Sequence, residues 1–233
     1  MLRLFCFPFA GGTASSYSAW RKQSDNGFEV CPIEYPGRGS RFKESGCETL
    51  AKLVETIGAD LRSQLQQPYA LLGHSFGGIV AFELARLLNS SNSPMPVRLF
   101  ISAIRAPHLR QPEKIHDLQE QEFLSKLMSY DGVPQEVLKN SELLSLVVPI
   151  IRHDFRLYER YVYRNDDPLP VPISVFGGLQ DTKVPAADLM AWSRHTRKSF
   201  RCRFFSGGHF FLYDPRFPVM REIQNDINAS ITS

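Results

Sequence analysis

The pentapeptide GHSFG at residues 73–77 places Ser75 where a serine can act as a nucleophile. A short apolar run, residues 69–72, comes before it, and an apolar pattern with helical spacing follows it. In a G-x-S-x-G sequence of this kind, a strand turns sharply into a helix and presents the serine hydroxyl at the carboxyl end of a sheet. The glycines leave room for close packing of strand and helix, and the amino end of the helix directs partial positive charge at the serine. Five residues alone are a weak signal, but the flanking strand and helix patterns strengthen it.

A nucleophilic serine needs a base, and with this motif the partners follow in the chain order serine, then an acid, then histidine. Four of the six histidines belong to the pentapeptide or precede any acid that ends a later strand. Of the other two, His195 lies in the amphipathic helical pattern ADLMAWSRHTRK, which is typical of a solvated surface histidine. His209 follows the strand-like FRCRFF and the turn SGG. We therefore predict His209 as the base.

The acid that orients the base is expected on a loop after one of the two strands that follow the serine. The first of these strands, within VRLFISAIRAPHL, ends without a carboxylate, whereas the second ends in GGLQD at Asp181. Asp154 and Asp166 precede that second strand, and Asp214 follows the histidine. We assign Asp181 as the acid, with an ordinary surface-turn aspartate as the alternative.

The opening segment RLFCFPFAGG admits three interpretations: a signal peptide, a phosphate-binding loop or part of an active site. Pro8 and the single early basic residue Arg3 argue against a signal peptide, and GGTASS lacks the spacing of a phosphate loop. An oxyanion hole in this kind of site takes one backbone N–H from the residue after the nucleophile and another from a loop after an early strand. We predict that Phe76 supplies the first and Ala10 the second, with Phe9 as the alternative to Ala10. Because cleavage here would remove a core strand and half of the oxyanion hole, we expect a cytoplasmic protein.

Six segments together extend these assignments: CFPFAGG, EYPGRGSR, LLGHSFGG, RHDFRLYERY, FGGLQD and GGHFFL. In this order and at about this spacing they resemble the type II, or editing, thioesterases of polyketide and nonribosomal peptide synthase systems, within the α/β-hydrolase thioesterase family. The resemblance runs nearly from end to end. In that family the elbow serine, the aspartate of G-x-x-D and the histidine of G-G-H-F form the triad, which implies Ser75, Asp181 and His209 here. This agrees with the assignment from chain order.

The resemblance implies a function: a serine hydrolase that releases acyl groups from the phosphopantetheine arms of acyl or peptidyl carrier protein domains and so removes stalled or mis-primed acyl groups. No cofactor and no metal are expected. A medium-chain acyl-carrier or acyl-CoA thioesterase and a carboxylesterase for small esters remain alternatives. A non-catalytic binding protein is a further alternative, against which the complete triad argues.

The fold that must position these residues is predicted to be α/β, a single α/β-hydrolase domain over residues 1–233 with a mostly parallel central sheet and helices on both faces. Residues 49–65 predict a helix that packs through one apolar stripe. The segment between the fourth and fifth strands is several times longer than the dozen or so residues of a parallel crossover, and we predict a helical lid at 107–168. Strands are expected near residues 2–8, 29–34, 69–74, 97–103, 172–177 and 201–206.

The apolar positions of the predicted lid can be interpreted in two ways. They either line an acyl tunnel or form the core of the lid itself, and the second is expected for most of them. These positions are Phe123, Leu124, Leu127, Leu143, Leu144, Val147, Val148 and Ile151.

Composition limits the possible partners. The chain has 233 residues, with 27 basic and 24 acidic side chains and a net charge of +3, which is too balanced for a nucleic-acid binder that depends on phosphate contacts. No apolar stretch approaches the ~18 residues that cross a bilayer, so no membrane association is expected. The four cysteines lack C-x-x-C spacing and are expected to be free, buried thiols. A monomer is expected.

Two groups of basic residues leave alternatives open. Arg38, in PGRG, either contacts substrate or fixes a turn through a salt bridge. The second group either receives an acidic carrier protein or forms an ordinary solvated face of a helix and a strand. It comprises Arg194, Arg197, Lys198, Arg201 and Arg203.

Overall fold

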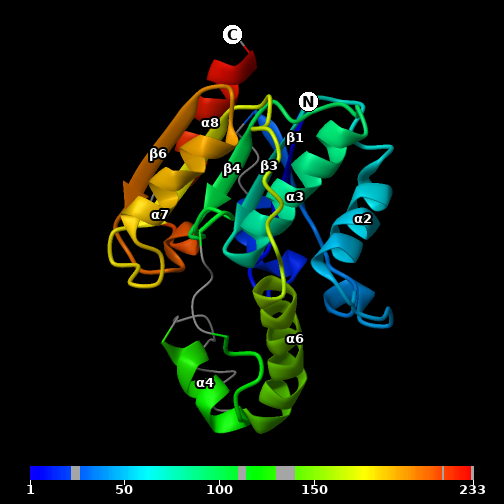
Figure 1. Cartoon of the computed structure of the whole chain (residues 1–233), viewed down its shortest axis with the longest axis vertical. Coiled ribbons are helices and arrows are strands. Elements are labelled where there is room, and N and C mark those ends of the chain that lie inside the picture. Colours follow the sequence, from blue (N-terminus) through cyan, green and yellow to red (C-terminus); the bar gives the residue numbers. More distant parts are fainter. Residues whose placement is uncertain (22–26, 110–113, 130–139, 217, 232–233) are drawn as a thin grey trace.

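A parallel sheet forms the centre of the molecule (Figure 1). The computed structural model describes residues 1–21, 27–109, 114–129, 140–216 and 218–231. The strands are hydrogen-bonded in the order β2-β1-β3-β4-β5-β6, and all five neighbouring pairs are parallel. Their bounds are β1 (Leu2–Phe7), β2 (Phe28–Pro32), β3 (Tyr69–His74), β4 (Leu99–Ser102), β5 (Ile173–Gly178) and β6 (Phe200–Phe205). Each strand begins and ends within two residues of the bounds predicted from the sequence.

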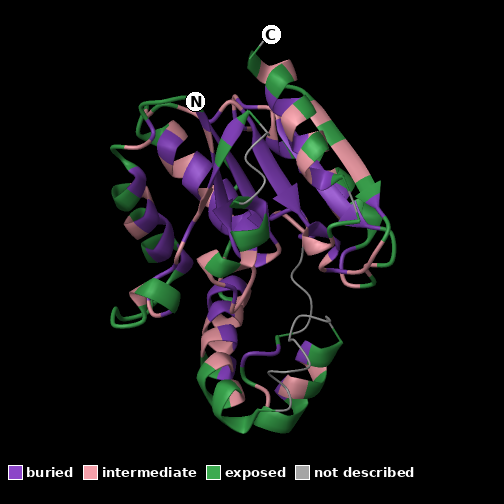
Figure 2. Cartoon of the chain, turned by 180° about the vertical axis from the view of Figure 1, so that it is seen from behind, coloured by how far each residue is buried: buried purple, intermediate pink, exposed green. Residues whose placement is uncertain are grey.

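Helices cover both faces of this sheet, as predicted. One face packs against α2 (Leu50–Leu61), α3 (Phe76–Ser90) and α7 (Ala186–Met190), and the other against α1 (Ser18–Arg21) and α8 (Val219–Ile231). Because both faces are covered, β3 and β5 are buried at every residue, which explains their nearly continuous apolar sequences. Figure 2 shows the buried strands between the helices, whose outer surfaces are exposed.

Helix α2 illustrates how the sequence specifies an element. The Thr49 side chain caps its amino end by accepting a hydrogen bond from the Lys52 amide at 3.1 Å. The predicted apolar stripe is buried against the sheet and α3. Its members are Leu50, Leu53, Val54, Ile57 and Leu61, with Leu65 buried just beyond the helix.

Among the described residues between β4 and β5, the structure has two helices, α4 (Glu120–Met128) and α6 (Ser141–Glu159). In Figure 1 they extend beyond the end of the sheet, on the side opposite to the two termini. They share a small apolar core of their own, in which Phe123 is fully buried. The Arg152 guanidinium stacks 4.1 Å from the centre of the Phe123 ring and donates hydrogen bonds to the carbonyls of His116 and Leu118. Parts of the predicted lid, residues 110–113 and 130–139, lie outside the described residues.

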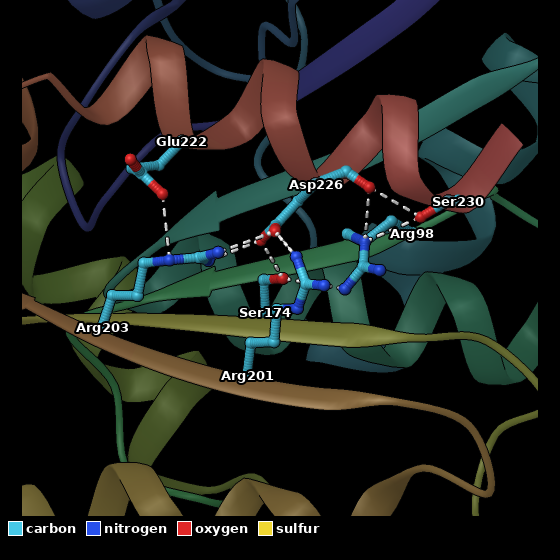
Figure 3. A network of polar contacts seen from close by, with 7 residues as sticks. All are labelled: Arg98, Ser174, Arg201, Arg203, Glu222, Asp226 and Ser230. Carbon is cyan, nitrogen blue, oxygen red and sulfur yellow. Dashed lines mark hydrogen bonds and ion pairs between the residues drawn. The ribbon is translucent and has the colours of Figure 1, made fainter. Parts of the chain in front are cut away.

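Helix α8 is attached to the sheet by a buried carboxylate, Asp226, which is fully inaccessible to solvent (Figure 3). It accepts hydrogen bonds from Arg201 at 2.5 Å, Arg203 at 2.7 Å and the Ser174 hydroxyl at 2.6 Å. Arg201 and Arg203, considered above as part of a docking face, therefore hold α8 against β5 and β6. Both arginines belong to β6. Arg201 lies near the amino end of this strand, whereas Ser75 follows the carboxyl end of β3.

The four cysteines are free, as predicted, but only Cys6 is buried. The prediction of burial was wrong for Cys31, Cys47 and Cys202, which are partly exposed because they lie near the edges of the sheet or in a loop. Of the helices within the described ranges, none is both long enough and apolar enough to cross a membrane.

Candidate active site

Ser75 occupies the turn between β3 and α3. Its backbone has φ 52° and ψ −124°, a strained conformation for a residue with a side chain. A Cβ atom on Gly77 would collide with the carbonyl oxygen of Phe7, and one on Gly73 would collide with the carbonyl of Gly77. The two glycines of the motif are therefore required by the close approach of β1, β3 and α3, and this approach fixes the serine hydroxyl at the carboxyl end of the sheet.

The structure brings together the three residues predicted as a triad. The Ser75 Oγ lies 3.0 Å from His209 Nε2, and His209 Nδ1 lies 2.8 Å from Asp181 Oδ2. The side chains of His209 and Asp181 are 5% and 2% exposed, so water competes little for their hydrogen bond. Asp181 also accepts a hydrogen bond from the Lys183 amide at 2.8 Å. In this arrangement Nε2 can accept the serine proton while Asp181 holds the imidazole through Nδ1–H.

Both predicted oxyanion donors lie at the same cavity as Ser75 and His209. Phe76 is the first residue of α3, so its amide has no acceptor in a preceding turn of helix. Ala10 lies in a turn closed by a 2.8 Å hydrogen bond from the Gly12 amide to the Phe9 carbonyl. Within the part of the chain that the structure describes, no acceptor lies at the Ala10 amide. Two backbone N–H groups are thus available beside the serine hydroxyl.

The cavity beside Ser75 is largely apolar and is closed on one side by α4 and α6. Of the eight apolar positions discussed for the lid, only Leu127 and Ile151 reach it. Leu143 is 43% exposed, so it belongs neither to the cavity nor to a buried core. The lining consists of Phe9, Ala10, Ser75, Phe76, Ala103, Ile104, Arg105, Leu127, Ile151, Phe155, Tyr158, Lys183, Val184, His209 and Phe210.

A second histidine, His74, packs against the ring of His209, the predicted base. Its ring is fully buried, 5.5 Å from the His209 ring, and its Nδ1 lies 3.0 Å from the Ser102 hydroxyl. Burial, together with the neighbouring His209, lowers the pKa of His74 well below its ordinary value. His74 therefore stays neutral and adds no positive charge beside His209.

The sequence leaves two roles open for Arg38, a contact with substrate or a salt bridge, and the structure shows a salt bridge. Its guanidinium forms a two-pronged ion pair with the fully buried Asp154, at 2.5 and 2.6 Å. Burial alone would raise the pKa of Asp154, but the hydrogen bonds and charge of Arg38 lower it below its ordinary value. The salt-bridge interpretation of Arg38 is the one observed. The two members of the pair are 116 residues apart in the chain, so no local pattern predicts it. The available signal is that PGRG and RHDF, which contain Arg38 and Asp154, both belong to the segments that resemble the thioesterase family.

His195 differs from its sequence prediction. It is 3% exposed rather than solvated, and it packs against the rings of Phe82 and Trp192. Its Nε2 lies 2.7 Å from Nδ1 of His108, in the segment that follows β4. Burial and the neighbouring His108 lower the pKa of His195 to about 4. The prediction of a solvated histidine was wrong because His108, which is distant in the sequence, packs against the side of the helical segment that carries His195.

Among residues 1–21, 27–109, 114–129, 140–216 and 218–231, no three His, Cys, Asp or Glu side chains form a cluster suited to a metal ion. The groups that the structure brings together at the cavity are a serine hydroxyl, an imidazole, a carboxylate and two backbone amides.

Known proteins are similar to this chain in sequence and architecture. A family model described as thioesterase domain matches residues 2–227. The gramicidin S biosynthesis protein GrsT of Aneurinibacillus migulanus is 37% identical over 94% of this chain and 86% of its own, and the thioesterase PikA5 of Streptomyces venezuelae is 36% identical over 97% and 80%. The solved structure of RedJ, a thioesterase from the prodiginine biosynthetic pathway in Streptomyces coelicolor, superposes with a TM-score of 0.91. It is 32% identical and covers 97% of this chain and 90% of its own.

Proposed function

The chain belongs to the thioesterase domain family of the α/β-hydrolase fold, and from this premise we propose that it is a type II thioesterase that releases acyl groups from carrier proteins. The observation that carries the proposal is the hydrogen-bonded series from Ser75 through His209 to Asp181 at the edge of an apolar cavity. The names of two relatives, GrsT of gramicidin S biosynthesis and RedJ of the prodiginine biosynthetic pathway, support a role beside a polyketide or nonribosomal peptide synthase.

In the first half of the reaction, the Ser75 oxygen attacks the carbonyl carbon of the thioester while His209 Nε2 takes the hydroxyl proton. Negative charge develops on the carbonyl oxygen, which the amides of Phe76 and Ala10 stabilise. The C–S bond then breaks, and the imidazolium returns its proton to the departing sulfur. A thiol has a pKa of about 8.5, so this step needs less help from an acid than the departure of an amine.

In the second half, water attacks the acyl-serine ester. His209 takes a proton from the water, the same two amides stabilise the second oxyanion, and the serine leaves with that proton. Asp181 holds the imidazole in the orientation that both halves require, through the 2.8 Å contact with Nδ1. The products are a carboxylic acid and the free thiol.

Several features of the whole chain belong to the same proposal. Residues 107–168 act as a helical lid on a single domain, because α4 and α6 supply one wall of the cavity. The partner is a phosphopantetheinylated carrier domain of a synthase, whose arm enters between lid and sheet. We place the protein in the cytoplasm, together with the synthase that it serves.

The test is a panel of substrates that share one acyl group. A carrier protein, coenzyme A and a p-nitrophenyl ester each carry it, and release is followed by intact mass or absorbance with wild type and Ser75→Ala. We expect efficient release from the carrier, lost in Ser75→Ala. Rapid cleavage of the oxygen ester with the carrier thioester left intact would instead identify a carboxylesterase for small esters.

A further inference from the structure

The loop that carries the Ala10 amide is fastened by side chains on both sides of that residue. The Gly11 amide donates a 2.7 Å hydrogen bond to Asp154 Oδ2, and Arg38 donates one of 3.3 Å to the Gly12 carbonyl. On the other side, the Tyr35 hydroxyl donates to the Pro8 carbonyl at 3.1 Å. The orientation of Ala10 N–H is therefore fixed by groups that never touch the reacting atoms.

Asp154 belongs to α6, so this fastening connects the oxyanion loop to the proposed lid. On the same helix face, at the spacing of neighbouring turns, Ile151, Phe155 and Tyr158 line the cavity. Gly11 lies so close to this helix that a Cβ atom on it would collide with the Ile151 side chain. One face of α6 therefore contacts both the space for the acyl group and the loop that is to stabilise its oxyanion.

The charges of the pair also matter. An isolated carboxylate beside the oxyanion loop would oppose the negative charge that develops on the substrate. Arg38 is 3% exposed and spans both oxygens of Asp154, so the pair presents a neutral unit to the loop. The guanidinium itself is held over the Tyr35 ring, 5.1 Å from its centre. The arrangement thus keeps a strong acceptor for Gly11 N–H without leaving an uncompensated charge.

We propose that Asp154 and Arg38 are positioning residues for catalysis: they hold the Phe9–Gly12 turn so that the Ala10 amide points at the oxyanion, and they tie this geometry to the position of α6. The inference rests on the proposed function, since it assigns the pair a role in the same reaction. A displaced donor costs much of the stabilisation that it provides, so loosening the turn should lower kcat/KM by roughly 10- to 100-fold. KM should change little, because the cavity itself is retained.

The test compares two buried carboxylates, Asp154 held by Arg38 and Asp226 held by Arg201 and Arg203. Asp154→Asn disturbs the turn, whereas Asp226→Asn breaks the network of Figure 3, which joins α8 to β5 and β6 rather than to the turn. Each variant is assayed with a small acyl thioester and with two inhibitors of equal chain length. An alkyl trifluoromethyl ketone adds to Ser75 and places an oxyanion at the amides, and the matching methyl ketone binds without stable addition.

We expect Asp154→Asn to bind the trifluoromethyl ketone roughly 10- to 100-fold more weakly, in step with its loss of kcat/KM, and to bind the methyl ketone as wild type does. Asp226→Asn should keep wild-type affinity for both. A folded Asp154→Asn with wild-type affinity for the trifluoromethyl ketone would overturn the proposal. If Asp154→Asn does not fold, Arg38→Lys, which keeps the charge but loses the two-pronged geometry, is judged by the same two affinities. Wild type that neither hydrolyses thioesters nor binds the trifluoromethyl ketone through Ser75 would instead contradict the proposed function.

Discussion

At the scale of single residues, the account depends on Ser75, His209 and Asp181 acting as one unit. The distances of 3.0 and 2.8 Å join them in one series, so each loses its role when another is removed. We predict that Ser75→Ala and His209→Ala each lower kcat by several orders of magnitude, and that the double variant is little worse than either single variant. Steady-state kinetics on a small acyl thioester, with circular dichroism to confirm folding, measures this.

The control for the acid is Asp214→Asn, because Asp214 pairs with the exposed Arg216 outside the cavity. Asp154, which also competes for the acid role in the sequence, is unsuitable because it is buried against Arg38. Losses in the double variant that multiply, or equal effects of Asp181→Asn and Asp214→Asn, would refute the assignment of the triad.

His195 gives a residue-scale prediction about pH. Its pKa falls from an ordinary value of 6.5 to about 4 in the folded state, so the unfolded chain binds more protons between these two values. Stability is therefore present above pH 6.5 and is lost as the pH falls toward 4, by on the order of 3 kcal/mol. We expect His195→Gln to unfold in urea with a weaker dependence on pH over this interval. The same pH dependence in wild type and variant would show that His195 is not the group responsible.

At the scale of elements, the packing of β1, β3 and α3 determines where the serine lies. A methyl group on Gly77 would meet the Phe7 carbonyl, which is backbone and cannot turn aside. We predict that Gly77→Ala lowers the free energy of unfolding by about 2–3 kcal/mol and reduces activity in the fraction that folds.

The matched control is Gly58→Ala on α2, where a Cβ atom would make ordinary contacts at 3.4 and 3.5 Å with Leu84 and Leu87. Since alanine favours a helix, this change should be neutral or stabilising by up to about 1 kcal/mol. Urea denaturation of both variants tests the pair, and equal stabilities would contradict the close-packing explanation.

The same elements show how far a sequence can be interpreted alone. Strand positions and the order of the triad could be predicted because apolar runs, glycine turns and chain order are local signals. The partner of Arg38 could not be predicted from local signals, because Asp154 lies 116 residues away in the chain, on α6. Likewise, Arg201 and Arg203 have the sequence of an exposed basic face, and only the approach of Asp226 from α8 reveals their structural role.

At the scale of the whole molecule, the proposal concerns a partner larger than the reacting group. The thioester is the same on a carrier protein and on coenzyme A, so any preference must arise from contacts away from Ser75. We predict a higher kcat/KM for the carrier-bound acyl group at low salt. Because this chain carries a net charge of +3 and contacts between exposed charges are screened within ~8 Å at physiological ionic strength, the preference should shrink as salt rises.

The salt series has its own control in the small thioester, whose hydrolysis should change little. The arginines at residues 201 and 203 are bound to α8, so we expect Arg201→Gln to alter stability more than the carrier preference. Equal kcat/KM for carrier and coenzyme A substrates at low salt would favour a general acyl thioesterase.

The central claim, that Ser75 carries the acyl group during turnover, is tested most directly by mixing enzyme with acyl-loaded carrier protein, quenching in acid within milliseconds and determining the mass of the enzyme and of its peptides. The account predicts an enzyme heavier by one acyl group, with the ester on the peptide that contains Ser75, and no release or adduct with Ser75→Ala. Release by Ser75→Ala at the wild-type rate, or an acyl group attached to another residue, would contradict it.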